Sequence, residues 1–277
     1  MNDNENAPTS GVETIVREEQ EKASAVAGTP PKESPPPVVL VVDVGGTKLK
    51  ILASGQTEPR KIPSGAQLTP KLMVEAVAQA ADDWNYDVVS LGFPGLVGDH
   101  GPNSEPGNLA AGWVGFDYAA AFGKPVRIIN DAAMQALGSY DGGRMLFLGL
   151  GTGLGSTLIA ENVIVPLELG QLPSPRGGTL GETLGRAGLA KIGKKEWRAT
   201  VESTVSMLTK AFLVDYIVLG GGNAKEFREP PPGARLGNNL TAFRGGFRLW
   251  HIEDVQTLPP EGIPLHPLPP PTQWRLI

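Results

Sequence analysis

The sequence predicts an α/β fold of two lobes around a cleft, in which the second lobe repeats the plan of the first. A strand, a glycine-rich turn and a second strand occur in that order twice, near residues 38–53 and near residues 145–160. Helical patterns and further strands follow both times. A pseudo-duplicated α/β architecture explains both occurrences with one idea, and 277 residues are enough for two such lobes.

The first lobe is expected over residues 38–140. It begins with an apolar, β-branched run that has the length of a buried strand. Thr69-Pro70 is typical of a helix start, because a capping threonine precedes a first-turn proline. The expected elements are strands at 38–42, 49–53, 88–92 and 126–129, and helices that begin near 69 and over 131–140.

The second lobe is expected over residues 141–250, where the pattern restarts. A glycine turn at 151–155 separates its first two strands, as a glycine turn does in the first lobe. The expected elements are strands at 145–150, 156–160 and 216–219 and a helix at 194–211.

Two flanking segments differ in composition from the body. Residues 1–37 hold seven acidic and three basic side chains and end in three prolines, so they predict a disordered leader, with at most one transient helix over 12–27. The beginning of the chain has neither the basic nor the apolar region of a secretory signal. Residues 251–277 carry seven prolines and predict an extended arm.

Composition excludes several classes of function. The chain has no cysteine, which excludes disulfides and thiolate metal sites and agrees with a cytoplasmic location. The net charge is −5, so there is no basic surplus for nucleic acid. No apolar run reaches the roughly 18 residues that a membrane helix needs.

The first motif that carries chemistry runs from Asp43 to Lys48. Gly45 and Gly46 let backbone N–H groups approach phosphate oxygens, with Thr47 and Lys48 beside them. Asp43, at the end of the strand, is suited to hold Mg²⁺ directly or through water. A plain β-hairpin with a Gly-Gly turn explains this motif equally well when it is taken alone.

The second motif contains Gly151, Thr152 and Gly153. It does not fit the dinucleotide-binding pattern, because a strand follows and the sixth positions are Leu154 and Ser156. A second phosphate-binding hairpin fits better than a glycine turn without function.

The third motif contains Gly221 and Gly222, after a strand. Its glycines would let a flat purine or sugar lie against the backbone. A helix start that needs close packing is the commoner explanation of such a motif alone.

The fourth motif is Asn130-Asp131, between a strand and a helix. An aspartate at such a place is usually a helix cap. It would also lie at the carboxyl edge of a sheet, where α/β proteins bind ligands and where a base can accept a hydroxyl proton.

These four motifs, in this order and spacing, resemble those of the ROK family (repressors, open reading frames, kinases) of the actin-like sugar kinase superfamily. The resemblance covers about residues 38–250. It implies the actin-like ATPase (ribonuclease H-like) fold and transfer of a phosphoryl group from ATP or polyphosphate to a hexose, by default the glucose 6-hydroxyl. It also implies that Asp131 is the catalytic base, that the two glycine turns bind donor phosphates, and that Gly221 and Gly222 belong to the adenosine motif.

The same resemblance implies a set of residues that bind the sugar. These are Asn108, Asn130, Glu168, Gln171 and, across gaps in the alignment, Glu182. Gln171 departs from the family, which has a histidine there that contacts sugar and a structural zinc. The family's zinc-binding cysteines are absent as well, so we expect Mg²⁺ and no zinc, as in the polyphosphate glucokinase branch.

The phosphoryl donor, the hexose and the choice between monomer and homodimer stay open at this stage. Five cations fall within thirteen residues and form either a track for polyphosphate or a solvated helix face. They are Arg186, Lys191, Lys194, Lys195 and Arg198.

Three other functions are alternatives. A sugar-responsive repressor would need a DNA-binding domain before residue 38, and 37 proline-bearing residues are too few for one. A catalytically inactive sugar-binding paralogue is disfavoured by the intact Asp43, Asp131 and glycine turns. A filament or chaperone ATPase would not need the sugar-contacting residues.

Overall fold

The computed structural model describes residues 35–238, 240–251 and 274–276. The described helices and strands lie in the unit formed by residues 37–277. The leader expected at 1–37 falls outside the described residues except for its last three. The tail expected at 251–277 does so except for residues 251 and 274–276, so both expectations stay predictions.

The first lobe is built on a five-stranded sheet in which three parallel strands continue into an antiparallel meander. In spatial order its strands are β3 (Arg60–Pro63), β2 (Lys48–Ala53), β1 (Val39–Val44), β4 (Val88–Phe93) and β7 (Val126–Asn130). A small separate hairpin is formed by β5 (Val97–Gly98) and β6 (Gly101–Pro102). The sheet is buried on both faces, since Val39 and Val41 of β1 face one apolar core and Leu40 and Val42 face another.

The second lobe is built on a six-stranded sheet. In spatial order its strands are β12 (Ala234–Leu236), β11 (Tyr216–Gly220), β8 (Arg144–Leu150), β9 (Leu154–Ala160), β10 (Val163–Leu167) and β13 (Arg275–Leu276). Strands β12, β11 and β8 are parallel, whereas β8, β9 and β10 form an antiparallel meander.

The two sheets have the same plan. The order β3-β2-β1-β4-β7 of the first corresponds strand by strand to β10-β9-β8-β11-β12 of the second, with the same pattern of directions. The alternation along β8 also repeats that of β1, because Met145 and Phe147 face the same core as Val39 and Val41. The prediction of a two-lobed α/β fold with a pseudo-duplicated lobe is therefore confirmed.

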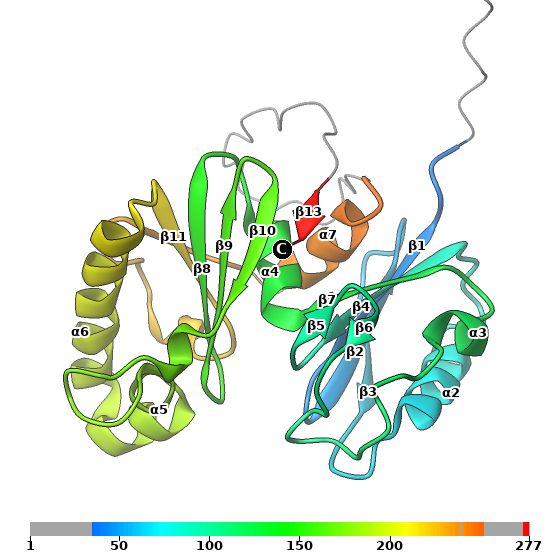
Figure 1. Ribbon diagram of the computed structural model, residues 1–277, viewed down its shortest axis with the longest axis horizontal. Coiled ribbons are helices and arrows are strands. Elements are labelled where there is room, and N and C mark those ends of the chain that lie inside the picture. Colours follow the sequence, from blue (N-terminus) through cyan, green and yellow to red (C-terminus); the bar gives the residue numbers. More distant parts are fainter. Residues whose placement is uncertain (1–34, 239, 252–273, 277) are drawn as a thin grey trace, which may run out of the picture. The chain divides into compact units, whose positions relative to one another are not determined.

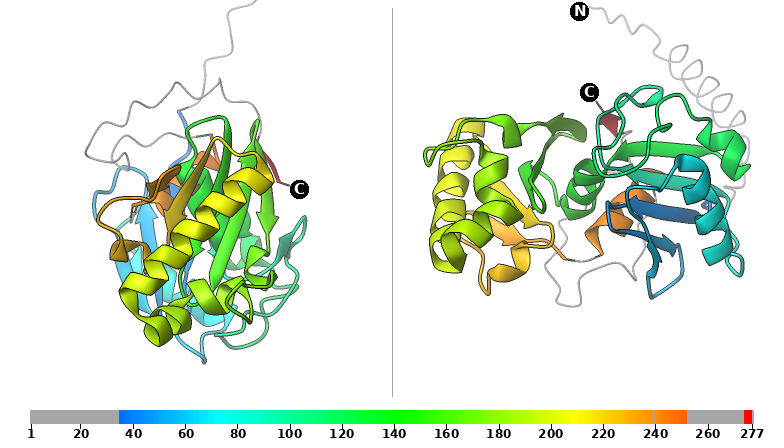
Figure 2. Two further views of the ribbon diagram at one scale, coloured as in Figure 1. Left: turned by 90° about the vertical axis from the view of Figure 1, so that its left-hand side faces the viewer. Right: turned by 90° about the horizontal axis from the view of Figure 1, so that it is seen from below.

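Helices cover both sheets and fill the space between them (Figure 1). The outer face of the first sheet is covered by α2 (Pro70–Ala80) and α3 (Tyr118–Phe122), and that of the second by α5 (Leu180–Leu184) and α6 (Arg186–Phe212). Figure 2 shows α6, in yellow, in front of the second sheet. Between the sheets lie α4 (Asp131–Ser139) and α7 (Thr241–Arg248), and short 3₁₀ turns occur at η1 (Leu169–Gln171) and η2 (Ala224–Glu226).

Helix α6 is broken at one residue. Gly193 has φ 78° and ψ 161°, a conformation that a helix does not contain and that glycine adopts without steric cost. The helix predicted at 194–211 corresponds to the segment after this break.

The two central helices cross at glycines. A Cβ on Gly138 of α4 would lie 1.7 Å from the carbonyl oxygen of Thr241, and one on Gly245 of α7 would lie 1.8 Å from the carbonyl oxygen of Met134. The backbones can approach this closely only because both residues lack a side chain. Helix α7 lies within the stretch expected for the second lobe, yet it also packs on β1 and β4 of the first sheet.

Two buried arginines of α7 hold the carboxyl end of α4. Arg248 donates from Nη1 to the carbonyl oxygens of Leu137 and Tyr140, each at 2.7 Å, and Arg244 donates to that of Gly138 at 3.3 Å. These carbonyls belong to the last turn of α4, where intrahelical partners run out and positive charge is stabilising. Helix α4 therefore has a fixed position between the sheets.

We expect Gly138→Ala to destabilise the protein by about 1–3 kcal/mol, the usual cost of forcing a methyl group into a packed interior. Gly65→Ala is the matched control, because a Cβ there meets no atom within 4 Å. Denaturant unfolding of both variants measures the difference. Equal stability of the two variants would show that the helices separate easily.

Candidate functional site

A cleft of about 430 Å³ lies where the two lobes meet the first turn of α4. It is lined by the turn after β1, the segment 94–97, the beginning of α4, the turn between β8 and β9, and the end of β10. Most predicted site residues come together in it. Those that line the cleft are Gly45, Gly46, Asn108, Asn130, Asp131, Gly151, Thr152, Gly153, Glu168 and Gly221.

Asp131 is the first residue of α4 and follows β7 directly. The pKa of its carboxyl is raised to about 7, mainly by burial and in smaller part by the negative charge of Asp43. The backbone N–H of Ala132, 2.8 Å from Oδ1, and the charge of Lys50 act in the opposite direction. A carboxyl with this pKa exchanges its proton near neutral pH, which suits a general base.

Asp43 stands opposite Lys50 in the β1–β2 ladder, and Lys50 Nζ donates to Asp43 Oδ2 at 2.8 Å. Asp43 has the same parity along β1 as Val39 and Val41, so it faces the side on which α4 lies. Its Oδ1 accepts no hydrogen bond from any residue that the structure describes. Mg²⁺ prefers one or two carboxylates together with water and phosphate oxygens, so Asp43 fits as a magnesium ligand.

The first glycine turn needs its glycines for two different reasons. A Cβ on Gly45 would lie 2.7 Å from the carbonyl oxygen of Lys48, so the turn could not close. A Cβ on Gly46 would lie 3.1 Å from Cβ of Asn108, which shows that Asn108 packs directly on the turn. Thr47 and Lys48 are exposed and do not line the cleft.

The second glycine turn is tied to the turn after β11. The carbonyl oxygen of Gly151 accepts hydrogen bonds from the backbone N–H of Arg186 at 3.0 Å and from Asn223 Nδ2 at 2.9 Å. Gly221 has φ 79°, and a Cβ there would lie 2.6 Å from the carbonyl oxygen of Leu150. Gly222, next to it, does not line the cleft.

The side-chain amide of Asn130 makes hydrogen bonds within the protein through both its oxygen and its nitrogen. Oδ1 accepts from the backbone N–H of Ala133 at 3.1 Å and caps α4, while Nδ2 donates to the carbonyl oxygen of Gly95 at 3.0 Å. The Asn130 side chain therefore joins the helix that carries Asp131 to the turn at 94–95. One amide hydrogen is left for a ligand.

The remaining predicted sugar-binding residues are spread further apart. Glu168 lines the cleft as the residue before η1, and Gln171, at the end of η1, is exposed and outside the lining. Glu182 lies outside it too and forms a capping box with Thr179 at the start of α5, its Oε2 accepting from the backbone N–H of Thr179 at 2.9 Å. Sugar contacts of Gln171 and Glu182 stay predictions.

The loop that carries Asn108 is held by a residue that sequence reasoning missed. Both carboxylate oxygens of Glu105 accept hydrogen bonds from the backbone N–H groups of Gly112, Trp113 and Val114, at 3.0 to 3.3 Å. These bonds, that from Trp113 foremost, lower the pKa of Glu105. Trp113 itself is fully buried in the outer core of the first lobe.

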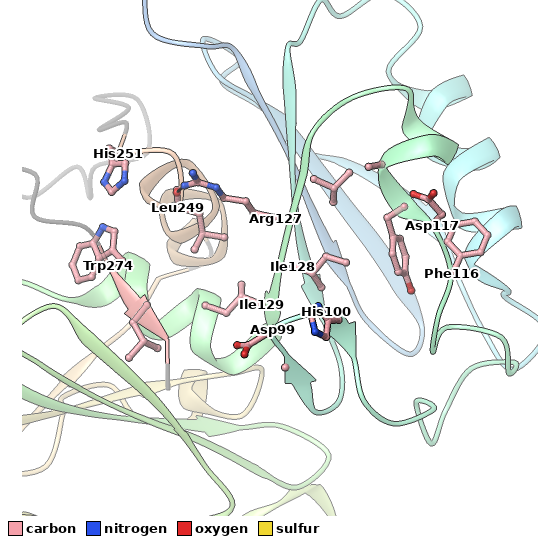
Figure 3. A pocket seen from close by; sticks show the side chains of 16 residues that line it. Asp99, His100, Phe116, Asp117, Arg127, Ile128, Ile129, Leu249, His251 and Trp274 are labelled. Atoms are coloured by element: carbon pink, nitrogen blue, oxygen red, sulfur yellow. Dashed lines mark hydrogen bonds between the residues drawn. The ribbon is translucent and has the colours of Figure 1, made fainter.

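A larger pocket of about 640 Å³ lies elsewhere, along β7. Figure 3 shows its lining, which includes Asp99, Asp117, Arg127, His251 and Trp274. It contains none of the residues predicted to carry the chemistry.

Proteins of similar sequence or fold include several sugar kinases. No protein-family model matches the sequence. Polyphosphate glucokinase of Mycobacterium tuberculosis (strain CDC 1551 / Oshkosh) is 24% identical over 208 residues, which are 67% of this chain and 77% of that protein.

Two solved structures are similar to this one. The inorganic polyphosphate/ATP-glucomannokinase from Arthrobacter sp. strain KM has a TM-score of 0.65 at 24% identity, covering 77% of this chain and 98% of that chain. A ROK family glucokinase from Streptomyces griseus, in complex with glucose and AMPPNP, has a TM-score of 0.54 at 19% identity, covering 81% and 92%. The resemblance to ROK sugar kinases is confirmed, and the chain has their actin-like ATPase fold.

We expect Glu105→Gln to raise the KM for the phosphoryl acceptor several-fold, because the loop carrying Asn108 loses its charge-assisted hydrogen bonds. The folded-state pKa of Glu105 is lowered, so its stabilisation is present above the unfolded pKa, about 4.5, and is lost as pH falls through the folded value. The deficit in Tm of the variant should therefore be largest at neutral pH and disappear in acid. Glu75→Gln on α2 is the control, since Glu75 makes only an exposed ion pair with Lys71.

Proposed function

We propose that this chain is a ROK family sugar kinase that transfers a phosphoryl group from ATP or polyphosphate to a hexose hydroxyl, the glucose 6-hydroxyl first. The observation that carries the proposal is Asp131, a carboxyl with a pKa of about 7 in a cleft between two glycine turns. Relatives named polyphosphate glucokinase and polyphosphate/ATP-glucomannokinase support it.

Asp131 would accept the proton of the attacking hydroxyl. A pKa near the working pH balances the fraction of ionised base against its strength as a proton acceptor. The amino end of α4 favours negative charge at this position, which keeps the ionised form accessible despite burial. Because the crossing of α4 and α7 is fixed, it would hold the carboxylate within hydrogen-bonding distance of the attacking hydroxyl.

The donor would lie along the glycine turns. Backbone N–H groups of the turns at 45–46 and 151–153 present no side chain to the phosphates and can donate to their oxygens. Asp43 would hold Mg²⁺, directly or through water, and the ion when bound neutralises charge on the phosphates. Lys50, paired with Asp43, adds a positive charge beside the first turn.

The sugar would be oriented by polar side chains that line the cleft together with Asp131. Asn108 and Glu168 line the cleft from opposite lobes, and Asn130 has one amide hydrogen left. Closure of the lobes would bring the two sets together and exclude water, which suppresses hydrolysis of the donor. Gln171 and Glu182 would join the sugar contacts only after such a movement.

The choice of donor depends on the cations of α6. Lys194 forms an ion pair of 2.8 Å with Glu226, which leaves less of its charge for a ligand than expected from the sequence. Lys191, Lys195 and Arg198 are exposed. A long polyanion would benefit from several spaced cations, whereas a nucleotide needs only the glycine turns and the residues near Gly221.

We expect Asp131→Asn to reduce kcat by roughly 10²–10⁴-fold while sugar affinity changes little, the usual effect of losing a positioned base. In the wild type, kcat/KM should rise with pH up to about pH 7 and then level, because the ionised carboxylate is the active form. A coupled assay over a panel of hexoses, with ATP and with polyphosphate, measures both. More than a tenth of wild-type turnover in the variant would reduce Asp131 to a helix residue without catalytic function. No transfer by the wild type to any hexose would leave a sugar-binding protein without catalysis.

We expect Lys195→Glu to raise the KM for polyphosphate several-fold and to leave that for ATP unchanged, with the effect fading as salt is added. Lys210→Glu is the matched control, an exposed lysine at the far end of the same helix. Identical KM values for both variants would mean that the cations of α6 are a solvated helix face.

A further inference from the structure

Gln135 lies in the cleft although no sequence motif contains it. It is on α4 one turn after Asp131, and residues four apart on a helix lie on the same face. The neighbouring residues Ala132, Ala133 and Met134 are buried in the core between the sheets. The Gln135 side chain therefore lines the same cleft as Asp131.

The amide faces the second lobe. The Gln135 Oε1 would be 3.6 Å from a Cβ placed on Gly220, at the end of β11. Gly149, which pairs with Gly220 on the adjacent strand β8, and Gly221, which follows Gly220, both line the cleft. They present backbone without side chains. Gln135 therefore stands between the base and the glycine turns of the second lobe.

The Gln135 side chain makes no hydrogen bond with any residue that the structure describes. It is half-buried, so its amide is partly removed from water. A half-buried amide directed into a cleft gains most when a ligand supplies its partner, since the loss of water is then compensated. The amide carries two N–H donors, which match phosphate oxygens.

The local charges favour an uncharged hydrogen-bond donor at this position. Asp131 lines the cleft, and the negative charge of Asp43, which lies outside the lining, acts on it. An anionic phosphoryl group beside them needs hydrogen-bond donors that add no further negative charge. A glutamine amide provides them.

We propose that Gln135 is a donor-positioning residue whose side-chain amide hydrogen-bonds the phosphoryl group being transferred. The inference rests on the proposed function. As the sugar oxygen forms its bond to phosphorus, the bond from phosphorus to the bridging oxygen of the donor breaks. The hydroxyl proton passes to Asp131, and the leaving group is the nucleoside diphosphate or a polyphosphate shortened by one unit. Gln135 holds the group in line between the two oxygens.

The test compares Gln135→Ala, Gln135→Asn and Gln135→Glu with Gln79→Ala and Gln79→Glu. Gln79 is an exposed glutamine of α2 and supplies the matched control. Donor affinity is measured by calorimetric titration with tripolyphosphate and with a non-hydrolysable ATP analogue, each with Mg²⁺. Steady-state kinetics give kcat and both KM values, and thermal unfolding checks that each variant is folded.

For Gln135→Ala we expect kcat/KM for the donor to fall roughly 10–100-fold, the range for losing a hydrogen bond to a charged group, with an unchanged KM for the sugar. In Gln135→Glu, kcat/KM for the phosphoryl donor should fall further, because the added carboxylate repels the phosphate. In Gln135→Asn, kcat/KM should have an intermediate value. The Gln79 variants should equal the wild type.

Wild-type donor affinity and kcat/KM in Gln135→Ala would overturn the inference. So would a raised KM for the sugar alone, because the amide would then face the acceptor. If Gln135→Ala does not fold, the same comparison is decided on Gln135→Asn. If the wild type transfers to no hexose, the proposed function fails, and the titrations still decide about Gln135: weaker donor binding in the variants supports its assignment, and unchanged or absent binding overturns it.

Discussion

The candidate site depends on one contact, the crossing of α4 and α7 at Gly138 and Gly245. Helix α4 carries Asp131 at its amino end and is held at its carboxyl end by Arg244 and Arg248 of α7. Helix α7 is in turn fixed to the first sheet, where Ser90 donates to the carbonyl oxygen of Gly246 at 2.6 Å. A helix pinned at its far end keeps its first residue in place, because a short helix moves as a rigid unit. The position of the base is thus set by packing about two helical turns away from the chemistry.

Duplication of the sheet explains why the two glycine turns and Asp131 occur together in one cleft. The glycine turns follow β1 and β8, which are equivalent strands of the two lobes, so both turns open at the same end of their sheets. Helix α4 lies between these sheets, and Ala132 in its first turn packs against Gly155 of the second lobe, where a Cβ would be only 2.9 Å from that of Ala132. The amino end of one helix therefore meets the backbone N–H groups of two turns. Neither lobe alone would bring these groups together.

The sequence indicates the parts of this arrangement that are local and misses those that depend on tertiary contacts. Asn130-Asp131 and the glycine turns could be predicted, because a cap, a turn and a strand leave their pattern within a few residues. Asn223 and Gln135 could not, since Asn223 acquires its role from a segment distant in sequence and Gln135 from the cleft itself. Glu105 accepts hydrogen bonds from residues only seven to nine positions later, but a carboxylate in an irregular loop leaves no periodic pattern that predicts them. Lys50 was detectable in principle, as the residue opposite Asp43 in a short hairpin. The spacing of Thr179 and Glu182 predicts a capping box at a helix start, which the family resemblance alone does not indicate. The small elements β3, β5 and β6 were missed because their sequences are short and lack a clear period. Helix α7 was missed because it is only eight residues long, although its sequence is amphipathic.

The charges of the cleft show why its hydrogen-bond donors are mostly neutral. A sugar kinase must hold a polyanion close to a carboxylate that accepts a proton, and cations next to that carboxylate would depress its pKa. Lys50 forms an ion pair with Asp43, so the negative charge of Asp43 offsets much of the effect of Lys50 on the pKa of Asp131. Other hydrogen-bond donors that line the cleft include the backbone N–H groups of the glycine turns and the amides of Asn130 and Gln135, none of which carries charge. A lysine in the place of Gln135 would attract the donor more strongly, yet it would also stabilise ionised Asp131 and weaken it as a base. In the proposed function, neutral hydrogen-bond donors would bind the phosphate and would leave Asp131 near the pKa at which proton acceptance is effective.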